Sequence, residues 1–118
     1  MVQTVASQLT IPVFVKIRLL ATLEQTIEVC AQLGAAGAAL IAIHARHRVN
    51  LADRSANARG GPALLEQVTA IRAELHRRQR LLDPGDSAPP KRQNAVPFII
   101  ANGNVREHAD VSAHHMCR

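Results

Sequence analysis

Three short apolar segments, each ending in polar residues, most constrain what this chain can fold into. They cover residues 11–18, 38–43 and 96–101, and their nearly continuous apolar character is typical of strands that are buried on most sides. Helical patterns separate the three segments, so the predicted order is β-α-β-α-β. Strands that alternate with helices in this way form parallel sheets. The sequence therefore predicts an α/β fold with three parallel strands.

Two segments between these strands have the spacing of amphipathic helices. The first begins at Thr22, which has Gln25 three positions later, and ends near Gly34. The second begins at Pro62 and ends near Arg78. The apolar faces comprise Leu23, Ile27 and Cys30 in the first helix, and Leu64, Val68, Ile71 and Leu75 in the second. We interpret residues 49–61 as a loop and residues 80–95, rich in Pro and Gly, as a flexible insertion.

Polar residues stand at the C-terminal end of each predicted strand. They are Lys16 and Arg18, then His44 and Arg46, then Asn102 and Asn104. Parallel strands have their carboxyl ends at one edge of the sheet, and α/β folds bind ligands there. The sequence therefore predicts one shared site at this edge.

Composition narrows the class of protein. The chain has 118 residues, which is the length of one small domain. Its formal charge is +5, and its basic residues are mostly Arg. This composition favours an anionic partner such as RNA. A coding bias toward Arg would explain the same composition. Only two aromatic residues, Phe14 and Phe98, are present, which argues against a self-contained module that stacks single-stranded bases.

Cysteine content and hydropathy exclude further classes. Two cysteines far apart in the sequence form neither a disulfide framework nor a zinc site, so we expect a reducing, cytoplasmic location and no metal. No apolar run approaches the roughly 20 residues of a membrane helix, and we expect no membrane association.

Three segments resemble, in order, the signature segments of the tRNA-dihydrouridine synthases. They are Pro-Val-Phe-Val-Lys-Ile-Arg at 12–18, His-Ala-Arg-His-Arg at 44–48 and Ile-Ala-Asn-Gly-Asn-Val at 100–105. The family patterns are approximately P-V-x-x-K-x-R, H-x-R-x-R and A-N-G-[DN]. No single segment is specific, but three in this order, each at a strand end, form a stronger signal. The resemblance covers about residues 11–108.

The resemblance implies a fold and an activity. These enzymes have an FMN-binding TIM-barrel catalytic domain and a helical RNA-binding domain, and they reduce uridine to dihydrouridine in tRNA with NADPH as the reductant. Residues 1–118 would then be the central part of the barrel domain, with about three of the eight βα units and without the helical domain.

The resemblance also implies FMN-binding roles for individual residues. These are Lys16, His44, Arg46, Asn102, Gly103 and Asn104. Lys16 matches a lysine that contacts the flavin, and the Asn-Gly-Asn segment matches a loop near the ribityl chain and phosphate. Each residue also has a purely structural explanation: Lys16 as a solvated strand-end lysine, and Asn102-Gly103 as an ordinary turn.

Other parts of the family pattern are expected to lie outside this chain. The catalytic cysteine of the family precedes the lysine strand, and neither Cys30 on a helix face nor Cys117 near the C-terminus matches it. The final barrel strands would follow Arg118. We therefore expect no catalytic residue here, no turnover by the chain alone, and self-association through exposed strand edges.

Two other functions fit the same residues. One is a different FMN-dependent TIM-barrel oxidoreductase, similar to dihydroorotate dehydrogenase, which also uses strand-end Lys and Asn-Gly turns. The other is a non-catalytic, RNA-associated fragment in which only the Arg residues matter and FMN does not bind.

Overall fold

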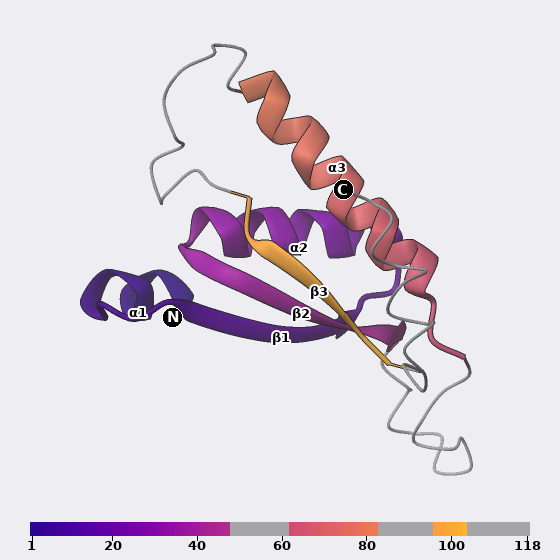
Figure 1. Ribbon diagram of the computed structural model, residues 1–118, viewed down its shortest axis with the longest axis horizontal. Coiled ribbons are helices and arrows are strands. Elements are labelled where there is room, and N and C mark those ends of the chain that lie inside the picture. Colours follow the sequence, from indigo (N-terminus) through magenta and orange to yellow (C-terminus); the bar gives the residue numbers. More distant parts are fainter. Residues whose placement is uncertain (48–61, 83–95, 104–118) are drawn as a thin grey trace.

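A parallel three-stranded sheet forms the centre of the computed structural model, which describes residues 1–47, 62–82 and 96–103 (Figure 1). The strands are β1 (Val13–Leu19), β2 (Ala38–His47) and β3 (Phe98–Asn102). They lie in the order β1-β2-β3, and both neighbouring pairs are parallel. The α/β fold with three parallel strands alternating with helices is thus confirmed.

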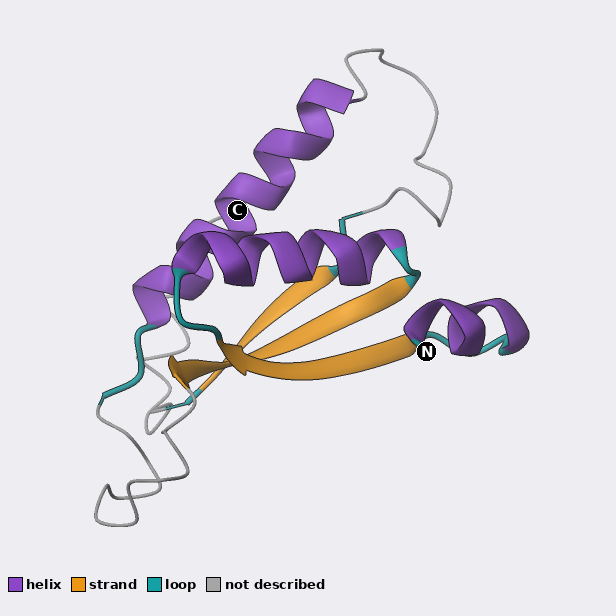
Figure 2. Ribbon diagram, turned by 180° about the vertical axis from the view of Figure 1, so that it is seen from behind, coloured by secondary structure: helices purple, strands orange, loops and turns teal. Residues whose placement is uncertain are grey.

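Two helices cover one face of this sheet. Helices α2 (Leu23–Ala35) and α3 (Leu65–Leu82) lie on the same side of the strands, as the view from behind shows (Figure 2). Helix α2 begins where the Thr22 hydroxyl oxygen accepts a hydrogen bond from the backbone N–H of Gln25 at 3.2 Å, so the predicted helix start is confirmed.

The core lies between the two helices and the sheet. The largest fully buried side chains are Leu19, Ile41, Ile43, Ile71, Cys30 and the hydroxyl-bearing Thr26, and Ile27, Val68 and Leu75 are also buried. The predicted apolar faces of both helices point into this core, because their i, i+3 and i+4 residues share one side of a helix. Leu23 and Leu64 are only partly buried at its margin.

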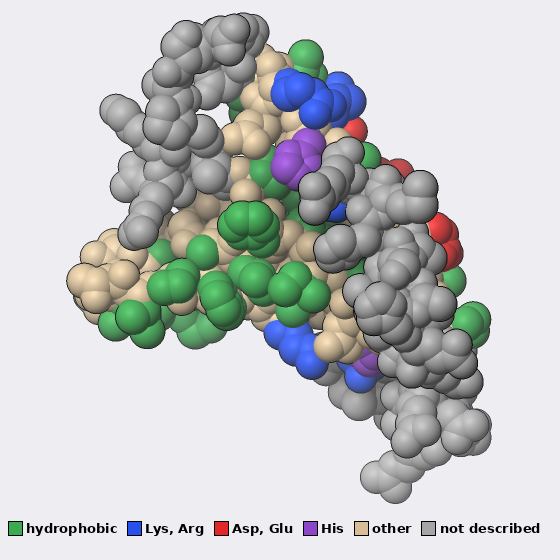
Figure 3. Space-filling view, in the orientation of Figure 1, with side chains coloured by type: hydrophobic (Ala, Val, Ile, Leu, Met, Phe, Trp, Pro, Cys, Tyr) green, Lys and Arg blue, Asp and Glu red, His purple; other side chains and the backbone are tan. Residues whose placement is uncertain are grey.

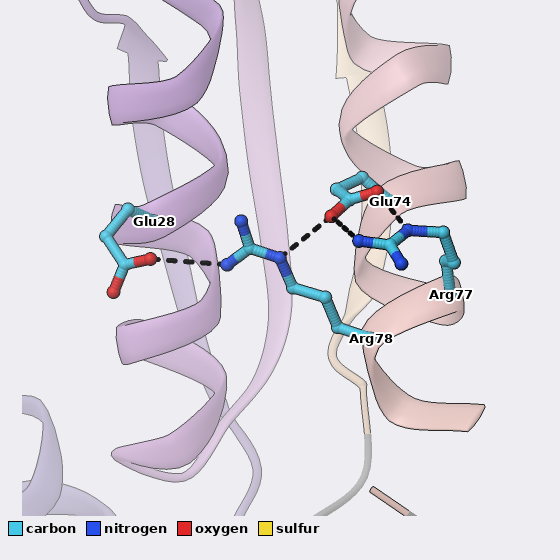
Figure 4. A network of polar contacts seen from close by, with 4 residues as sticks. All are labelled: Glu28, Glu74, Arg77 and Arg78. Atoms are coloured by element: carbon cyan, nitrogen blue, oxygen red, sulfur yellow. Dashed lines mark hydrogen bonds and ion pairs between the residues drawn. The ribbon is translucent and has the colours of Figure 1, made fainter. Parts of the chain in front are cut away.

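An ion-pair network joins α2 to α3 on the outer surface (Figure 4). Arg78 donates from Nη1 to Oε2 of Glu28 at 3.2 Å and from Nε to Oε1 of Glu74 at 2.9 Å. Arg77 donates to both oxygens of the same Glu74 carboxylate. Exposed pairs of this kind add little stability each, and the pair of Arg78 with Glu28 links the two helices across the surface.

Several elements differ from the sequence-based expectation. Strand β2 was expected to end at Ile43 but continues to His47, because residues 44 and 47 still pair with β1 across an irregularity in the register. Helix α3 extends to Leu82, three residues into the expected insertion. Residues 49–61, most of the insertion and the segment from residue 104 onward lie outside the described residues.

Helix α1 (Val2–Gln8) was not foreseen from the sequence. No side chain caps its N-terminus, its first turn has no acidic residue, and none of its residues is buried. It lies against the beginning of β1 and β2 (Figure 1). Contacts with the sheet, rather than local signals, therefore account for its position.

Among the described residues, no helix or strand covers the face of the sheet opposite α2 and α3, in contrast to the expected burial of the strands on most sides. Residues alternate between the two faces along β1 and β3, and the open face exposes Phe14 by 64% and Phe98 by 78%. Figure 3 shows hydrophobic side chains gathered over the strands, with Lys and Arg side chains beside them. The apolar runs of the sequence therefore supply two different surfaces, one in the core and one open.

Candidate functional site

One row of polar residues crosses the open face of the sheet near its C-terminal edge. The register pairs Arg18 on β1 with His44 on β2, and His44 with Asn102 on β3. Neighbouring strands are about 4.8 Å apart, so these three side chains lie side by side. Two earlier rows, Phe14-Leu40-Phe98 and Lys16-Ala42-Ile100, are apolar except for Lys16. The open face thus changes from apolar to polar toward the strand ends.

A hollow with a volume of about 440 Å³ lies at this end of the sheet. Its lining consists of Lys16, Ile17, Arg18, His44 and Asn102. Lys16, Arg18 and Asn102 are exposed, whereas His44 is partly buried. All three strands contribute to the lining, as predicted for one shared site at the strand ends.

The hollow is electrostatically positive. Lys16 and Arg18 carry full charges, and the described part of the lining includes no carboxylate. Burial lowers the pKa of His44, and the positive charges of Arg18, Arg46 and Lys16 lower it further. The site therefore combines two fixed cations with a histidine that favours its neutral form. This combination suits an anionic or electron-rich ligand.

Arg46 and Gly103 support His44 from outside the row. Nη1 of Arg46 donates a hydrogen bond to Nε2 of His44 at 3.0 Å. Gly103 has a φ of +126°, and a Cβ there would lie 3.4 Å from Cδ2 of His44 and 3.5 Å from Nη1 of Arg46. A glycine thus suits both the backbone conformation and the close approach of the chain after β3.

Two hydrogen bonds to backbone carbonyl groups hold the end of β2 in place. The N–H of Leu64, just before α3, donates to the carbonyl of Ala45 at 2.7 Å. Nδ1 of His47 donates to the carbonyl of Leu20 at 2.6 Å, next to the irregular pairing of Leu19 with His47. These contacts fix the segment from which His44 and Arg46 project.

The structure brings most of the predicted site residues together. Lys16, His44 and Asn102 line the hollow, Arg46 contacts His44, and Gly103 lies beside both of those residues. Asn104 lies outside the described residues. Arg18 was noted from the sequence as a strand-end residue but not as a site residue. Its two-residue spacing from Lys16 places both side chains on one face, which was the available signal.

The described ranges contain neither a candidate metal centre nor a candidate membrane span. No group of three or more His, Cys, Asp or Glu residues that could hold a metal ion occurs there. None of the helices in those ranges combines the length and the apolar character needed to cross a bilayer.

Comparison with protein families gives one match that covers most of the chain. A family model described as dihydrouridine synthase matches residues 1–79, which include β1, α2, β2 and most of α3. The match thus contains Lys16, Arg18, His44 and Arg46, whereas β3 follows it. Comparison with curated proteins and with solved structures gave no match. Because the family model spans well over half of its 118 residues, this chain belongs to the dihydrouridine synthase family.

Proposed function

We propose that the C-terminal edge of this sheet binds FMN and that the chain is part of an enzyme that reduces uridine to dihydrouridine in tRNA. Enzymes of this family are oxidoreductases that act on tRNA uridine and generally use FMN with NADPH as the reductant. The observation that carries the proposal is the row Arg18-His44-Asn102 beside Lys16, which joins three strands at one positive hollow. We also propose a cytoplasmic location, which is compatible with a tRNA substrate.

The residues of the hollow fit FMN in charge and in hydrogen bonding. Lys16 and Arg18 match the phosphate or the electron-rich edge of the flavin ring, and no described carboxylate of the lining opposes an anion. Asn102 offers an amide that both donates and accepts hydrogen bonds. The absence of a side chain at Gly103 permits a close approach of backbone to ligand. The volume lies within the usual range for ligand pockets.

When bound, reduced FMN supplies the hydride that adds to C6 of the uracil ring. In this proposal, Lys16 and Arg18 hold the negative charge of the cofactor, and Asn102 orients it from β3. The row Phe14-Leu40-Phe98 presents an apolar surface on the open face next to the hollow. The target base must leave its stack to reach this edge.

Cys30 does not supply the proton that C5 requires. Its thiol is fully buried in the core beneath the sheet, and burial raises its pKa to about 11. It does not line the hollow. We therefore propose that the general acid comes from outside the described residues, and we expect this chain alone to bind FMN without turnover.

We also propose that the three strands are one segment of a TIM barrel, with the open face as part of its interior. Parallel sheets normally have both faces covered, and the helices α2 and α3 of the described part of the chain lie on one face of this sheet. Strands β1 and β3 each have an edge that pairs with no described strand. We expect these edges to promote self-association of the isolated chain, which sedimentation velocity over a concentration series would detect.

Flavin fluorescence titration tests the proposed cofactor site. We expect saturable FMN binding by the chain, and about tenfold weaker binding by Lys16→Met, the loss typical of a hydrogen bond to a charged group. Arg80→Met on the exposed surface of α3 is the matched control, since it removes one charge away from the hollow. Failure of the folded chain to bind FMN, or equal affinities for the two variants, would contradict the proposal.

The same samples separate the alternative functions. Salt-sensitive RNA binding without flavin binding would select the non-catalytic, RNA-associated fragment. The family match favours the tRNA enzyme over a dihydroorotate dehydrogenase-like oxidoreductase. The affinities of the FMN-bound chain for dihydroorotate and for tRNA would compare these two functions directly.

A further inference from the structure

We propose that Arg46 is a positioning residue that holds His44 as its neutral Nδ1–H tautomer, so that His44 acts as a hydrogen-bond donor rather than an acid. The tautomer follows from contacts within the chain. Its use toward a ligand rests on the proposed function, because His44 lines the proposed FMN site.

The chemistry of the hydrogen bond between Arg46 and His44 places the proton of the ring. Nη1 of Arg46 lies 3.0 Å from Nε2 of His44. A guanidinium group has only donors, so Nε2 must accept and cannot carry a proton. This excludes the imidazolium form, in which both nitrogens are protonated, and the Nε2–H tautomer. The proton of the neutral ring is therefore on Nδ1.

The packing around the imidazole ring of His44 also fixes which edge faces Arg46. A Cβ at Gly103 would lie 3.4 Å from Cδ2 of His44 and 3.5 Å from Nη1 of Arg46. The Cδ2–Nε2 edge of the ring thus faces Arg46 and the backbone after β3. The Nδ1 atom lies on the opposite edge of the ring, away from Arg46. Rotation of the ring would exchange Nε2 for a carbon and break the bond to Arg46.

The charged groups around His44 favour the neutral form of its ring. Lys16 and Arg18 on β1 and Arg46 on β2 are the charged groups that act on it, and its neighbour on β3, Asn102, is neutral. The described residues place no carboxylate among these groups. Burial and the three cations all lower the pKa of His44. A neutral ring next to fixed cations can donate one hydrogen bond without adding a further charge to the site.

Imidazole nitrogen shifts measured by NMR on the ¹⁵N-labelled chain, without FMN, test the proposal. A His44→Gln variant identifies the His44 signals among those of the six histidines. At pH 7 we expect a pyridine-type shift for Nε2 and a pyrrole-type shift for Nδ1. A protonated Nε2 in the wild-type chain would overturn the proposal.

Two variants separate the hydrogen bond from the charge. Arg46→Met removes the donor, and we expect the tautomer ratio to move toward Nε2–H by about tenfold or more. Arg18→Gln removes a nearby charge but leaves the donor, so the pKa should rise while the tautomer stays. An unchanged ratio in Arg46→Met would refute the role of Arg46. If Arg46→Met fails to fold, Arg46→Gln replaces it, because an amide can also accept from Nε2 and the bias should weaken.

These readouts do not depend on cofactor binding. Loss of FMN binding with an intact Nδ1–H signal would count against the proposed function alone. A mixed tautomer in a chain that binds FMN would count against the role of Arg46 alone.

Discussion

Replacement of Gly34 by Ala tests how β3, which bears Asn102 and Gly103, is held against the rest of the fold. Gly34 lies in the last turn of α2, and helix propensity alone predicts that Ala would stabilise this helix by up to about 1 kcal/mol. The structure predicts the opposite. A Cβ at Gly34 would lie 2.7 Å from Cδ and 3.2 Å from Cγ of Pro97, the buried residue just before β3.

The expected loss of stability depends on which groups around the new methyl group can move. The Pro97 ring is closed onto its own backbone, so it cannot rotate away, and either α2 or the start of β3 must shift. Overpacking of this kind costs about 1–3 kcal/mol. After subtraction of the gain in helix propensity of about 1 kcal/mol, we expect Gly34→Ala to lower the free energy of unfolding by up to about 2 kcal/mol.

Urea unfolding of a double-mutant cycle measures this effect. Pro97→Ala removes the two ring carbons that the new methyl group would meet, so the double variant should recover about 1 kcal/mol or more as a coupling free energy. Ala35→Gly, at the exposed neighbouring position, is the control for helix propensity alone. A Gly34→Ala chain at least as stable as the wild type, with no coupling to Pro97→Ala, would refute the packing of α2 against the start of β3.

Two further predictions concern groups with shifted pKa values. Burial raises the pKa of the Cys30 thiol from 9.0 to about 11, so little of it is thiolate at pH 8. In a Cys117→Ser background, we therefore expect its reaction with Ellman's reagent at pH 8 to be about a hundredfold slower in the folded chain than in the urea-unfolded chain. Equal rates in the two states would show that the thiol is accessible. Hydrogen bonds from Arg77 and Arg78 lower the pKa of Glu74 from 4.5 to about 2, so its contribution to stability is present above pH 4.5 and is lost as the pH falls toward 2. Glu74→Gln should therefore flatten the decline of the urea midpoint over this pH range, and a decline as steep as in the wild type would contradict the role of the network.

Much of the fold could be predicted because its signals are local. Thr22 caps α2 through an atom three residues away, and Val68, Ile71 and Leu75 share one side of a single helix. The polar residues at the strand ends needed only the rule that parallel strands have their carboxyl ends at one edge. Lys16, His44 and Asn102 were therefore recognised before any contact between them was known.

The remaining features depend on contacts between segments that are distant in the sequence. Helix α1 has no capping side chain, and β2 continues to His47 because β1 lies beside it. The open face of the strands was missed because an apolar run has the same composition whether helices cover one side or both. The Arg46–His44 hydrogen bond joins neighbours on one strand, but Gly103 reaches this pair only through the pairing of β2 with β3. Patterns along the chain thus indicated the candidate site residues, whereas register and packing determine how closely these residues approach one another and lower the pKa of His44.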